Sequence, residues 1–222
     1  MQLLLKVIII FLPWKLKRIL LIWCFGYKID KTSRIGFSWI YPRRLILDSN
    51  ATIGHLNVAI HLDEIKMGAF ATIARSNWIT GYTSRLGGKH FLHQLDRVSS
   101  LTIGEHSAIT KNHHLDCTNT IIIGKFTTVA GYQSQLLTHS IDILEGRQNS
   151  NPICIGEYCF VGTNSVVLGG AVLPSFSVLG AKSLLNKAYQ NEYFLYGGVP
   201  AKPISEILKN TKYFLRTAGF IY

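Results

Sequence analysis

Aliphatic residues recur every six positions over the second half of the chain. The longest series is Ile155, Val161, Val167, Leu173, Leu179 and Leu185. Small residues stand four positions after the first five members, namely Cys159, Ser165, Ala171, Ser177 and Ser183. A period of six fits neither the α-helix, at about 3.6 residues, nor the simple strand, at about 2. It predicts a coil of three short, flat strands per turn, each pointing one aliphatic side chain inward, with small residues near the tight corners.

The same phase recurs in three segments further upstream. Its members are Ile103, Ile109, Leu115 and Ile121, then Ile123 and Val129 after a two-residue slip, and earlier Leu47, Ile53, Met67, Ile73 and Ile79. One aliphatic residue every six positions would mean little, because such residues are common. A run of six with matched small positions, repeated elsewhere, is specific, and we expect one coil over residues 29–187.

Two stretches break the repeat, at residues 82–100 and 140–152, and are expected to leave the coil as loops. Loops of this length inside a compact domain tend to be functional. Beyond Leu185 the period stops, and residues 188–222 are expected to form a C-terminal cap in which 204–222 is a basic, aromatic-rich helix. Stacked coils leave open strand edges at both ends, and this helix and the N-terminal segment are natural covers for them.

Residues 1–28 form an apolar, basic segment that Lys6 and the block 13–18 divide into two short runs. Each run is well below the ~20 residues that a spanning helix needs, and no small-residue cleavage site follows, which argues against a secretory signal. Two interpretations stay open. One is an interfacial element in the cytoplasmic leaflet of a membrane, which suits Trp14, Trp23 and the basic block. The other is a helix packed on the protein's own flank.

Composition narrows the function classes. Hydrophobic residues make up 48% and charged residues 16% of the 222 residues, which argues against disorder. The net charge of +11 comes without a helix-turn-helix, zinc-finger or RNA-binding signature, so no nucleic-acid partner is predicted. Phosphates of a cofactor or of lipid headgroups fit this charge better. Cys24, Cys117, Cys154 and Cys159 show no metal-ligand spacing, and unpaired cysteines favour a reduced, cytoplasmic protein.

The stretch 155–187, followed by 198–202 (Gly-Val-Pro-Ala-Lys), closely resembles the bacterial hexapeptide-repeat acyltransferases, which include maltose, galactoside and polysaccharide O-acetyltransferases. The resemblance covers roughly residues 29–205. Segments 12–14 (Leu-Pro-Trp) and 137–142 look like the branch of exopolysaccharide and cell-surface glycan enzymes. It implies an all-β chain folded as a left-handed parallel β-helix, and a homotrimer with active sites in clefts between neighbouring coils. It also implies acetyl-CoA, or another acyl-CoA, as co-substrate, with no metal.

Acyl transfer to a sugar hydroxyl needs a base, and histidine suits this role because its ordinary pKa lies near neutrality. His139 stands where the repeat gives way to the second loop, and at the position where the resemblance places the catalytic histidine. Asp142 and Glu145, just downstream, and Asp116, in the preceding coil, are candidates to orient it. The sequence does not choose among them. A backbone N–H near Gly162 or Thr163 is a candidate oxyanion donor.

The resemblance also implies a donor site at Gly162, Thr163, Ala181, Lys187 and Lys202. Small residues let a thin pantetheine arm lie against the backbone, and the lysines neutralise phosphate charge. On the acceptor side the chain departs from the maltose-type pattern, with His113 and His114 as candidates to line a pocket. Turn packing is the alternative for His113. The first loop, with His90, His93, Asp96 and Arg97, is expected to reach into a neighbour's cleft.

The sequence therefore favours an O-acyltransferase that modifies a sugar of a surface polysaccharide or of its lipid-linked precursor, by direct transfer in a ternary complex. Such an enzyme is expected in the cytoplasm, in peripheral contact with the membrane. N-acylation of a nucleotide-linked amino sugar and acyl carrier protein as donor remain open. Two further alternatives use the same coil: a zinc-dependent γ-type carbonic anhydrase, with His106, His113 and His114 as the closest spaced histidines, and a non-catalytic scaffold.

Overall fold

Three parallel β-sheets wrap the chain into a triangular prism. The computed structural model describes residues 2–84 and 89–221. Sheet A contains β1 (Lys28–Ile29), β4 (Arg44–Leu47), β7 (Glu64–Met67), β10 (Ser100–Ile103), β13 (Ile121–Ile123), β18 (Ile153–Ile155) and β21 (Val172–Leu173). Sheet B contains β2 (Arg34–Ile35), β5 (Thr52–Ile53), β8 (Thr72–Arg75), β11 (Ala108–Lys111), β14 (Thr128–Val129), β19 (Phe160–Val161), β22 (Val178–Leu179), β24 (Phe194–Gly198) and β25 (Ala201–Glu206). Sheet C contains β3 (Trp39–Tyr41), β6 (Val58–Ile60), β9 (Trp78–Thr80), β12 (His114–Asp116), β15 (Gln135–Leu137), β20 (Val166–Leu168) and β23 (Leu184–Leu185).

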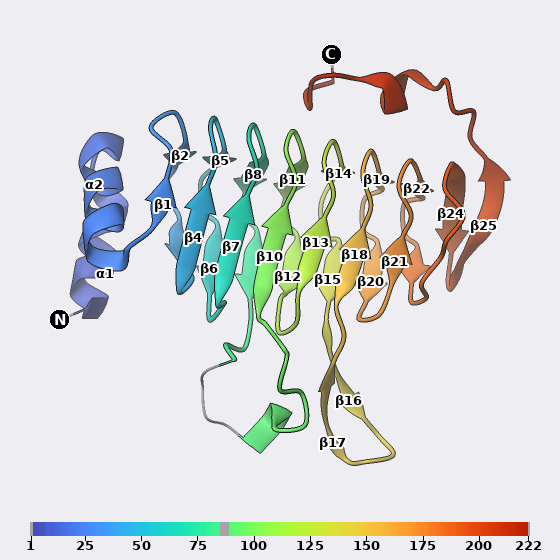
Figure 1. The fold of residues 1–222 in the computed structure, drawn as a ribbon, viewed down its shortest axis with the longest axis horizontal. Helices are drawn as coiled ribbons and strands as arrows, with labels where there is room; N and C mark the ends of the chain where they lie inside the picture. The colour runs from blue at the N-terminus through green and yellow to red at the C-terminus, as the bar shows by residue number, and fades with distance from the viewer. Residues whose placement is uncertain (1, 85–88, 222) are drawn as a thin grey trace.

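Successive coils stack in register, so equivalent residues lie directly above one another (Figure 1). In sheet B, for example, Ile109 pairs with Val129, which pairs with Val161. These inward aliphatics are at most 1% exposed. The prediction of a coil with one inward aliphatic per strand is therefore confirmed, and the core is a continuous apolar column along the prism axis.

Two helices cover the first coil. Helix α1 (Gln2–Phe11) and helix α2 (Trp14–Phe25) are joined at Pro13, which has no N–H to donate and ends the first helix before it. Ile9 and Leu21 are buried against the first coil at 0% and 2% exposure. Within residues 2–84 and 89–221, no helix combines the length and apolarity needed to cross a membrane.

The C-terminal helix predicted over 204–222 is wrong. Strand β25 pairs antiparallel with β24 at the end of sheet B, and its pairing covers the edge that the helix was expected to cover. The chain then runs back along the corner between sheets A and B, with only a short 3₁₀ turn at Lys212–Leu215 (Figure 1). We call residues 207–221 the C-terminal tail.

The tail packs on a column of stacked rings at this corner. Adjacent ring centroids are 4.7–5.2 Å apart and nearly parallel along Phe70, His106, Phe126, Tyr158, Phe176 and Tyr193. Each of these residues has a positive φ between 54° and 61°, the corner conformation that turns the chain from sheet A into sheet B. The spacing of the rings matches the 4.7–4.9 Å strand repeat, so one ring per coil builds the column.

Candidate active site

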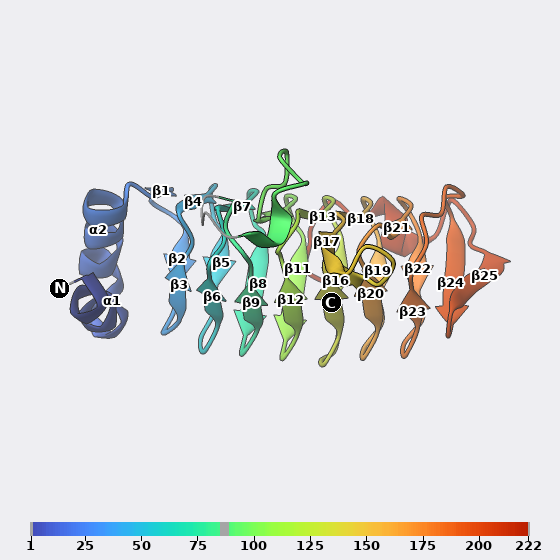
Figure 2. The ribbon, with the colours of Figure 1, turned by 90° about the horizontal axis from the view of Figure 1, so that it is seen from below.

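Both interruptions of the repeat leave the prism at one corner, between sheets C and A. The first excursion connects β9 to β10 and contains a short 3₁₀ turn at Lys89–Phe91. The second is an antiparallel hairpin of β16 (His139–Asp142) and β17 (Arg147–Ser150), between β15 and β18. The excursions project side by side (Figures 1 and 2). Gln94 of the first donates to Asn149 Oδ1 and to the carbonyl of Ser150 in the second, both at 2.8 Å.

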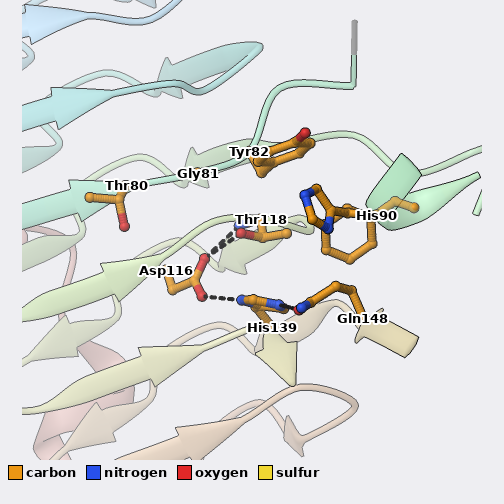
Figure 3. Close-up of a pocket in the computed structure, with 9 residues that line it drawn as sticks. Thr80, Gly81, Tyr82, His90, Asp116, Thr118, His139 and Gln148 are labelled. Atoms are coloured by element: carbon orange, nitrogen blue, oxygen red, sulfur yellow. Dashed lines mark hydrogen bonds and ion pairs between the residues drawn. The ribbon is translucent and has the colours of Figure 1, made fainter. Parts of the chain in front are cut away.

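His139 is the first residue of the hairpin, and its imidazole lies between two polar partners (Figure 3). Nδ1 is 3.7 Å from Oδ2 of Asp116, and Nε2 is hydrogen-bonded to the side-chain amide of Gln148. The ring also meets the ring of Phe91 edge-on at 5.7 Å. The side chain is 37% exposed, so it stays accessible to a substrate.

Asp116 comes from the end of β12, one coil before His139. Strand pairing sets Asp116 opposite Leu137, two residues before His139. Its Oδ1 accepts the backbone N–H of Thr118 at 2.9 Å and the Thr118 hydroxyl at 2.7 Å. These bonds hold the carboxylate in place and leave Oδ2 facing the imidazole.

A pocket of about 330 Å³ opens beside this pair, within the range of roughly 300–1,000 Å³ typical of ligand sites. It is lined by Thr80, Gly81, Tyr82, His90, Phe91, Asp116, Thr118, His139 and Gln148. Its residues come from two successive coils and from both excursions. Two aromatic rings and an imidazole from the first excursion form one wall, and the His139–Asp116 pair forms the other (Figure 3).

The base of the first excursion is tied to the coil by Asp63, at the corner after β6. Asp63 accepts the backbone N–H groups of Ser84 at 2.9 Å and Ser99 at 3.1 Å, together with the hydroxyl of Thr83. Burial would raise the pKa of Asp63, but these hydrogen bonds outweigh it and hold the pKa below its ordinary value. One carboxylate thus joins both ends of the loop.

Arg97 of the first excursion points inward, toward the prism. It is 7% exposed and donates from one guanidinium nitrogen to the carbonyls of Tyr82 and Thr118, both at 2.5 Å. The guanidinium lies 4.4 Å from the centre of the Phe91 ring. Arg97 therefore holds the pocket wall together from behind. Residues 85–88 lie outside the described part of the chain.

The other two predicted carboxylates do not approach His139. Asp142 accepts the backbone N–H of Glu145 at 3.2 Å and lies 3.9 Å from Arg147 across the hairpin. Glu145 is exposed at the hairpin turn. The hairpin explains this, because it carries the residues after His139 away from the prism and from the imidazole. The structure brings only Asp116 of the three candidates to the imidazole.

His113 and His114 do not line this pocket. His113 is 1% exposed at the corner between sheets B and C, where Nδ1 accepts the N–H of Ser134 and Nε2 bonds to the Thr110 hydroxyl. Burial lowers its pKa to about 4, so the turn-packing alternative describes it. His114 opens β12 on the outer face of sheet C, facing a separate hollow with Trp78 and Gln135. Asp116, at the other end of the same strand, is the residue that reaches the candidate site.

The predicted donor residues fall at different places on the prism. Gly162, Thr163 and Ala181 lie at the corner between sheets B and C, one or two residues past the ends of β19 and β22 in sheet B. Lys187 lies at the C–A corner, two coils beyond the hairpin, and its carbonyl accepts the N–H of Val172. Lys202 is exposed on β25. Within one chain, therefore, only Lys187 shares a corner with His139.

Gly162 is required by the coil itself. A β-carbon at this position would collide with the backbone of Ala181 in the next coil, which explains the glycine without a ligand. Its N–H donates to the carbonyl of Leu179 at 2.8 Å, so Gly162 is not a free oxyanion donor. The hydroxyl of Thr163 is likewise engaged, with the backbone of Tyr132.

Several pocket residues escaped the sequence reasoning, notably Gln148, Thr118, Tyr82 and Phe91. The position of the loop 82–100 was the available signal, but which of its rings faces the hairpin depends on Asp63 and Arg97. Among the described residues, no cluster of histidine, cysteine, aspartate or glutamate side chains could hold a metal ion. The three histidines considered for zinc are also separated, since His106 is stacked in the ring column while His113 and His114 lie elsewhere.

Comparison with known proteins adds information on the fold. The sequence matches no protein-family model, and no curated protein matches it significantly. The polysialic acid O-acetyltransferase OatWY superposes with a TM-score of 0.55 at 16% identity, over 86% of this chain and 90% of that one. A mutant of AntD, an N-acyltransferase from Bacillus cereus bound to dTDP-4-amino-4,6-dideoxyglucose and coenzyme A, gives 0.52 at 14%, over 87% and 88%.

A hexapeptide-repeat acetyltransferase from Vibrio cholerae is 25% identical, with a TM-score of 0.45, over 49% of this chain. This chain covers 63% of that protein's length. The sixfold repeat, the three parallel sheets and the two superpositions above 0.5 together identify the fold of this chain as that of the hexapeptide-repeat acyltransferases.

Proposed function

We propose that this chain is an acyl-CoA-dependent O-acyltransferase that moves an acyl group, first of all acetyl, onto a sugar hydroxyl, with His139 as the general base. The single observation that carries the proposal is the position of His139. Its imidazole stands between a fixed carboxylate and an open pocket with aromatic walls. A base with one nitrogen held by a carboxylate and the other directed to a substrate is the arrangement that activates hydroxyl nucleophiles.

In the proposed reaction, Nδ1 of His139 carries its proton toward Asp116 and Nε2 accepts the proton of the acceptor hydroxyl. The hydroxyl oxygen attacks the thioester carbonyl carbon, the carbon–sulfur bond breaks, and the imidazolium returns the proton to the leaving thiolate. The Asp116 carboxylate stabilises the imidazolium that forms in between. Because the thioester is already activated, no covalent acyl-enzyme is needed.

Gln148 occupies the position at Nε2 that the acceptor hydroxyl requires. Its amide is hydrogen-bonded to Nε2 in the absence of a substrate, and an amide presents either a donor or an acceptor on rotation. We propose that the acceptor hydroxyl replaces this amide on binding, and that Gln148 then bonds a neighbouring hydroxyl of the sugar. Tyr82, His90 and Phe91 provide flat surfaces for the apolar face of the sugar ring.

The donor site is proposed to lie between copies. Gly162, Thr163 and Ala181 lie at the B–C corner and His139 at the C–A corner, so a second copy has to present its B–C corner to this one. A homotrimer of left-handed coils supplies this arrangement three times. Lys187 and Lys202 are then available to the phosphates of acetyl-CoA.

The proposed acceptor is a sugar of a surface polysaccharide or of its lipid-linked precursor, modified on the cytoplasmic side of the membrane where acetyl-CoA is made. The pocket volume and its aromatic wall support a sugar unit as the acceptor. An assay with both hydroxylated glycans and amino sugars, described next, distinguishes transfer to a hydroxyl from transfer to an amine.

Release of free thiol from acetyl-CoA tests the function. The purified protein is assayed with hydroxylated oligosaccharides, with nucleotide-linked amino sugars and with no acceptor. We expect acceptor-dependent turnover with a hydroxylated glycan and a loss of roughly 10² to 10⁴ in turnover for His139→Ala. His55→Ala is the matched control, because it removes an exposed histidine of the second coil that lies outside the pocket, and it should retain activity.

Size-exclusion chromatography with light scattering shows whether both variants keep the wild-type mass. Full activity in His139→Ala would refute its role as the base. Turnover with amino sugars alone would replace the O-acyl proposal by N-acyl transfer, and no turnover with any acceptor would favour a scaffold.

A further inference from the structure

The N-terminal helices present an uncovered apolar surface at one end of the prism. One side of the helix pair packs on the first coil, while the opposite side exposes large apolar side chains at helical spacing, with Phe11 at the rim, where its ring meets Phe37 of the first coil edge-on at 5.1 Å. These are Leu3, Leu4, Val7, Ile8 and Phe11 of α1, and Leu16, Ile19 and Trp23 of α2. Trp23 is 83% exposed and Phe11 is 70% exposed. We call these eight side chains the end face. A contiguous apolar patch of this kind marks an interaction site rather than an ordinary protein surface.

The net charge of the N-terminal part of the chain indicates what kind of partner the end face contacts. Residues 1–47 contain nine basic residues and a single acid, Asp30, compared with 23 basic and 12 acidic residues in the whole chain. This fifth of the sequence thus carries +8 of the net charge of +11. Two such ends would repel each other, which argues against end-to-end pairing of copies. Anionic lipid headgroups over an apolar interior match both the charge and the side chains.

The helix pair is fixed to the prism rather than tethered to it. The buried Lys17 ammonium donates to the carbonyl of Gly36 at 2.7 Å, and burial lowers the pKa of Lys17 to about 8. Arg18 donates to the carbonyl of Ile29 at 2.6 Å. These bonds join α2 to the first coil, so the direction of the end face sets the direction of the whole prism (Figures 1 and 2).

This rigidity sets the height of the pocket above a surface that the end face contacts. The pocket is built on the third and fourth coils, at strands β9 and β12, and on the two excursions. A helix is roughly 10 Å across, and neighbouring strands are about 4.8 Å apart. The pocket therefore lies on the order of 20–25 Å from the outer side of the helices.

We propose that the end face docks on an anionic lipid bilayer and stands the prism upright on it. Resting on the proposed function, the geometry further assigns the acceptor class. A lipid-anchored saccharide must carry several sugar units before its outer end reaches the pocket, so the substrate is an extended lipid-linked glycan and not a lipid-linked monosaccharide.

Vesicle co-sedimentation of the full-length protein tests the docking. Vesicles of phosphatidylcholine alone are compared with vesicles that also contain phosphatidylglycerol. We expect binding to the anionic vesicles, reduced at least about tenfold on neutral vesicles and for the variant Phe11→Ser/Trp23→Ser. Lys15→Glu/Lys28→Glu should weaken only the anionic component. Ile143→Ser/Leu144→Ser is the matched control, because these hairpin-tip side chains are 88% and 96% exposed but lie away from the end face.

Equal binding of wild type and Phe11→Ser/Trp23→Ser would overturn the proposal. So would a fall in the solution mass of that variant, which would show that a second copy covers the end face. Thiol release with a soluble glycan is measured in parallel. If docking fails while turnover on the soluble glycan persists, the membrane proposal is wrong and the acyltransferase stands. If docking holds but no acceptor supports turnover, the membrane proposal stands and the proposed acyltransferase function is wrong.

Discussion

The two oxygens of Asp116 have different surroundings, and this difference gives the residue its proposed role. Oδ1 is occupied by the backbone and hydroxyl of Thr118, while Oδ2 faces Nδ1 of His139 at 3.7 Å. The turn after β12 thus fixes the carboxylate before any substrate arrives. A preorganised partner of this kind needs little rearrangement as charge develops on the imidazole.

Asp116→Asn is therefore expected to keep the bonds to Thr118 but to present an amide group to Nδ1. The wrong imidazole tautomer is then favoured, and we expect turnover to fall by roughly 10² to 10⁴ with little change in KM for the acceptor. Steady-state kinetics measure both constants. Asp142→Asn, on the hairpin but away from the imidazole, is the control. Equal losses in both variants would show that the hairpin fold, and not the carboxylate, is affected.

At the scale of elements, the first excursion depends on one carboxylate at its base. Asp63 receives N–H groups from both ends of the loop, at Ser84 and Ser99, and its pKa is held below the ordinary value by these bonds. Because the folded pKa is lowered, this stabilisation is complete above the ordinary carboxylate pKa of about 3.9 and is lost as pH falls through the lower folded value.

Asp63→Asn is expected to loosen the loop, because the amide offers one acceptor oxygen in place of two. Its NH₂ group would also face the backbone N–H groups of Ser84 and Ser99, which cannot accept a hydrogen bond. Stability should fall by about 1–3 kcal/mol, and amides over 89–99 should exchange faster. Urea unfolding as a function of pH, with hydrogen exchange, measures both effects. In the variant, the free energy of unfolding should fall less on acidification, because the contribution of the Asp63 carboxylate is already absent. Asp96→Asn, exposed in the same loop, should change neither quantity.

The elements that could be predicted are those encoded locally. The six-residue period fixed the inward positions, since each strand needs one aliphatic residue. The break in the period, together with the family resemblance, made His139 the candidate base. The choice among three carboxylates could not be made, because Asp116 reaches His139 through pairing between coils. The ring column was missed for a similar reason. Its members are separated by 17 to 36 residues, since the excursions differ in length, and they align only once the coils are stacked.

At the scale of the whole molecule, the prism is a one-dimensional stack in which each coil contacts its two neighbours. Such stacks lose their ends easily unless something covers them. The helices cover the first coil, and β25 extends the last. The C-terminal tail adds contacts between coils that are not adjacent. Tyr213 donates to the carbonyl of Cys159, Arg216 to that of Phe126, and the N–H of Gly219 to His106.

Arg216→Ala should detach this tail. The guanidinium lies 3.8 Å from the Tyr213 ring centre and contacts Phe126 and Tyr158 in two coils. We expect faster proteolysis within 207–221 and a broader urea transition, since the last coils would open before the first. Arg216→Lys should restore little, because an ammonium group lacks the flat surface that packs on rings. Lys212→Ala, exposed on the same tail, serves as control. An unchanged transition in Arg216→Ala would show that the tail adds no coupling.

Both excursions leave sheet C and return to sheet A at a single corner, and the strands on either side of them still pair in register with the coils above and below. The inserted segments add a wall to the pocket without changing the register in which the strands pair. If the proposed function holds, exchanging these two inserts between prisms would change the acceptor, while the scaffold that carries them keeps its core and its ends.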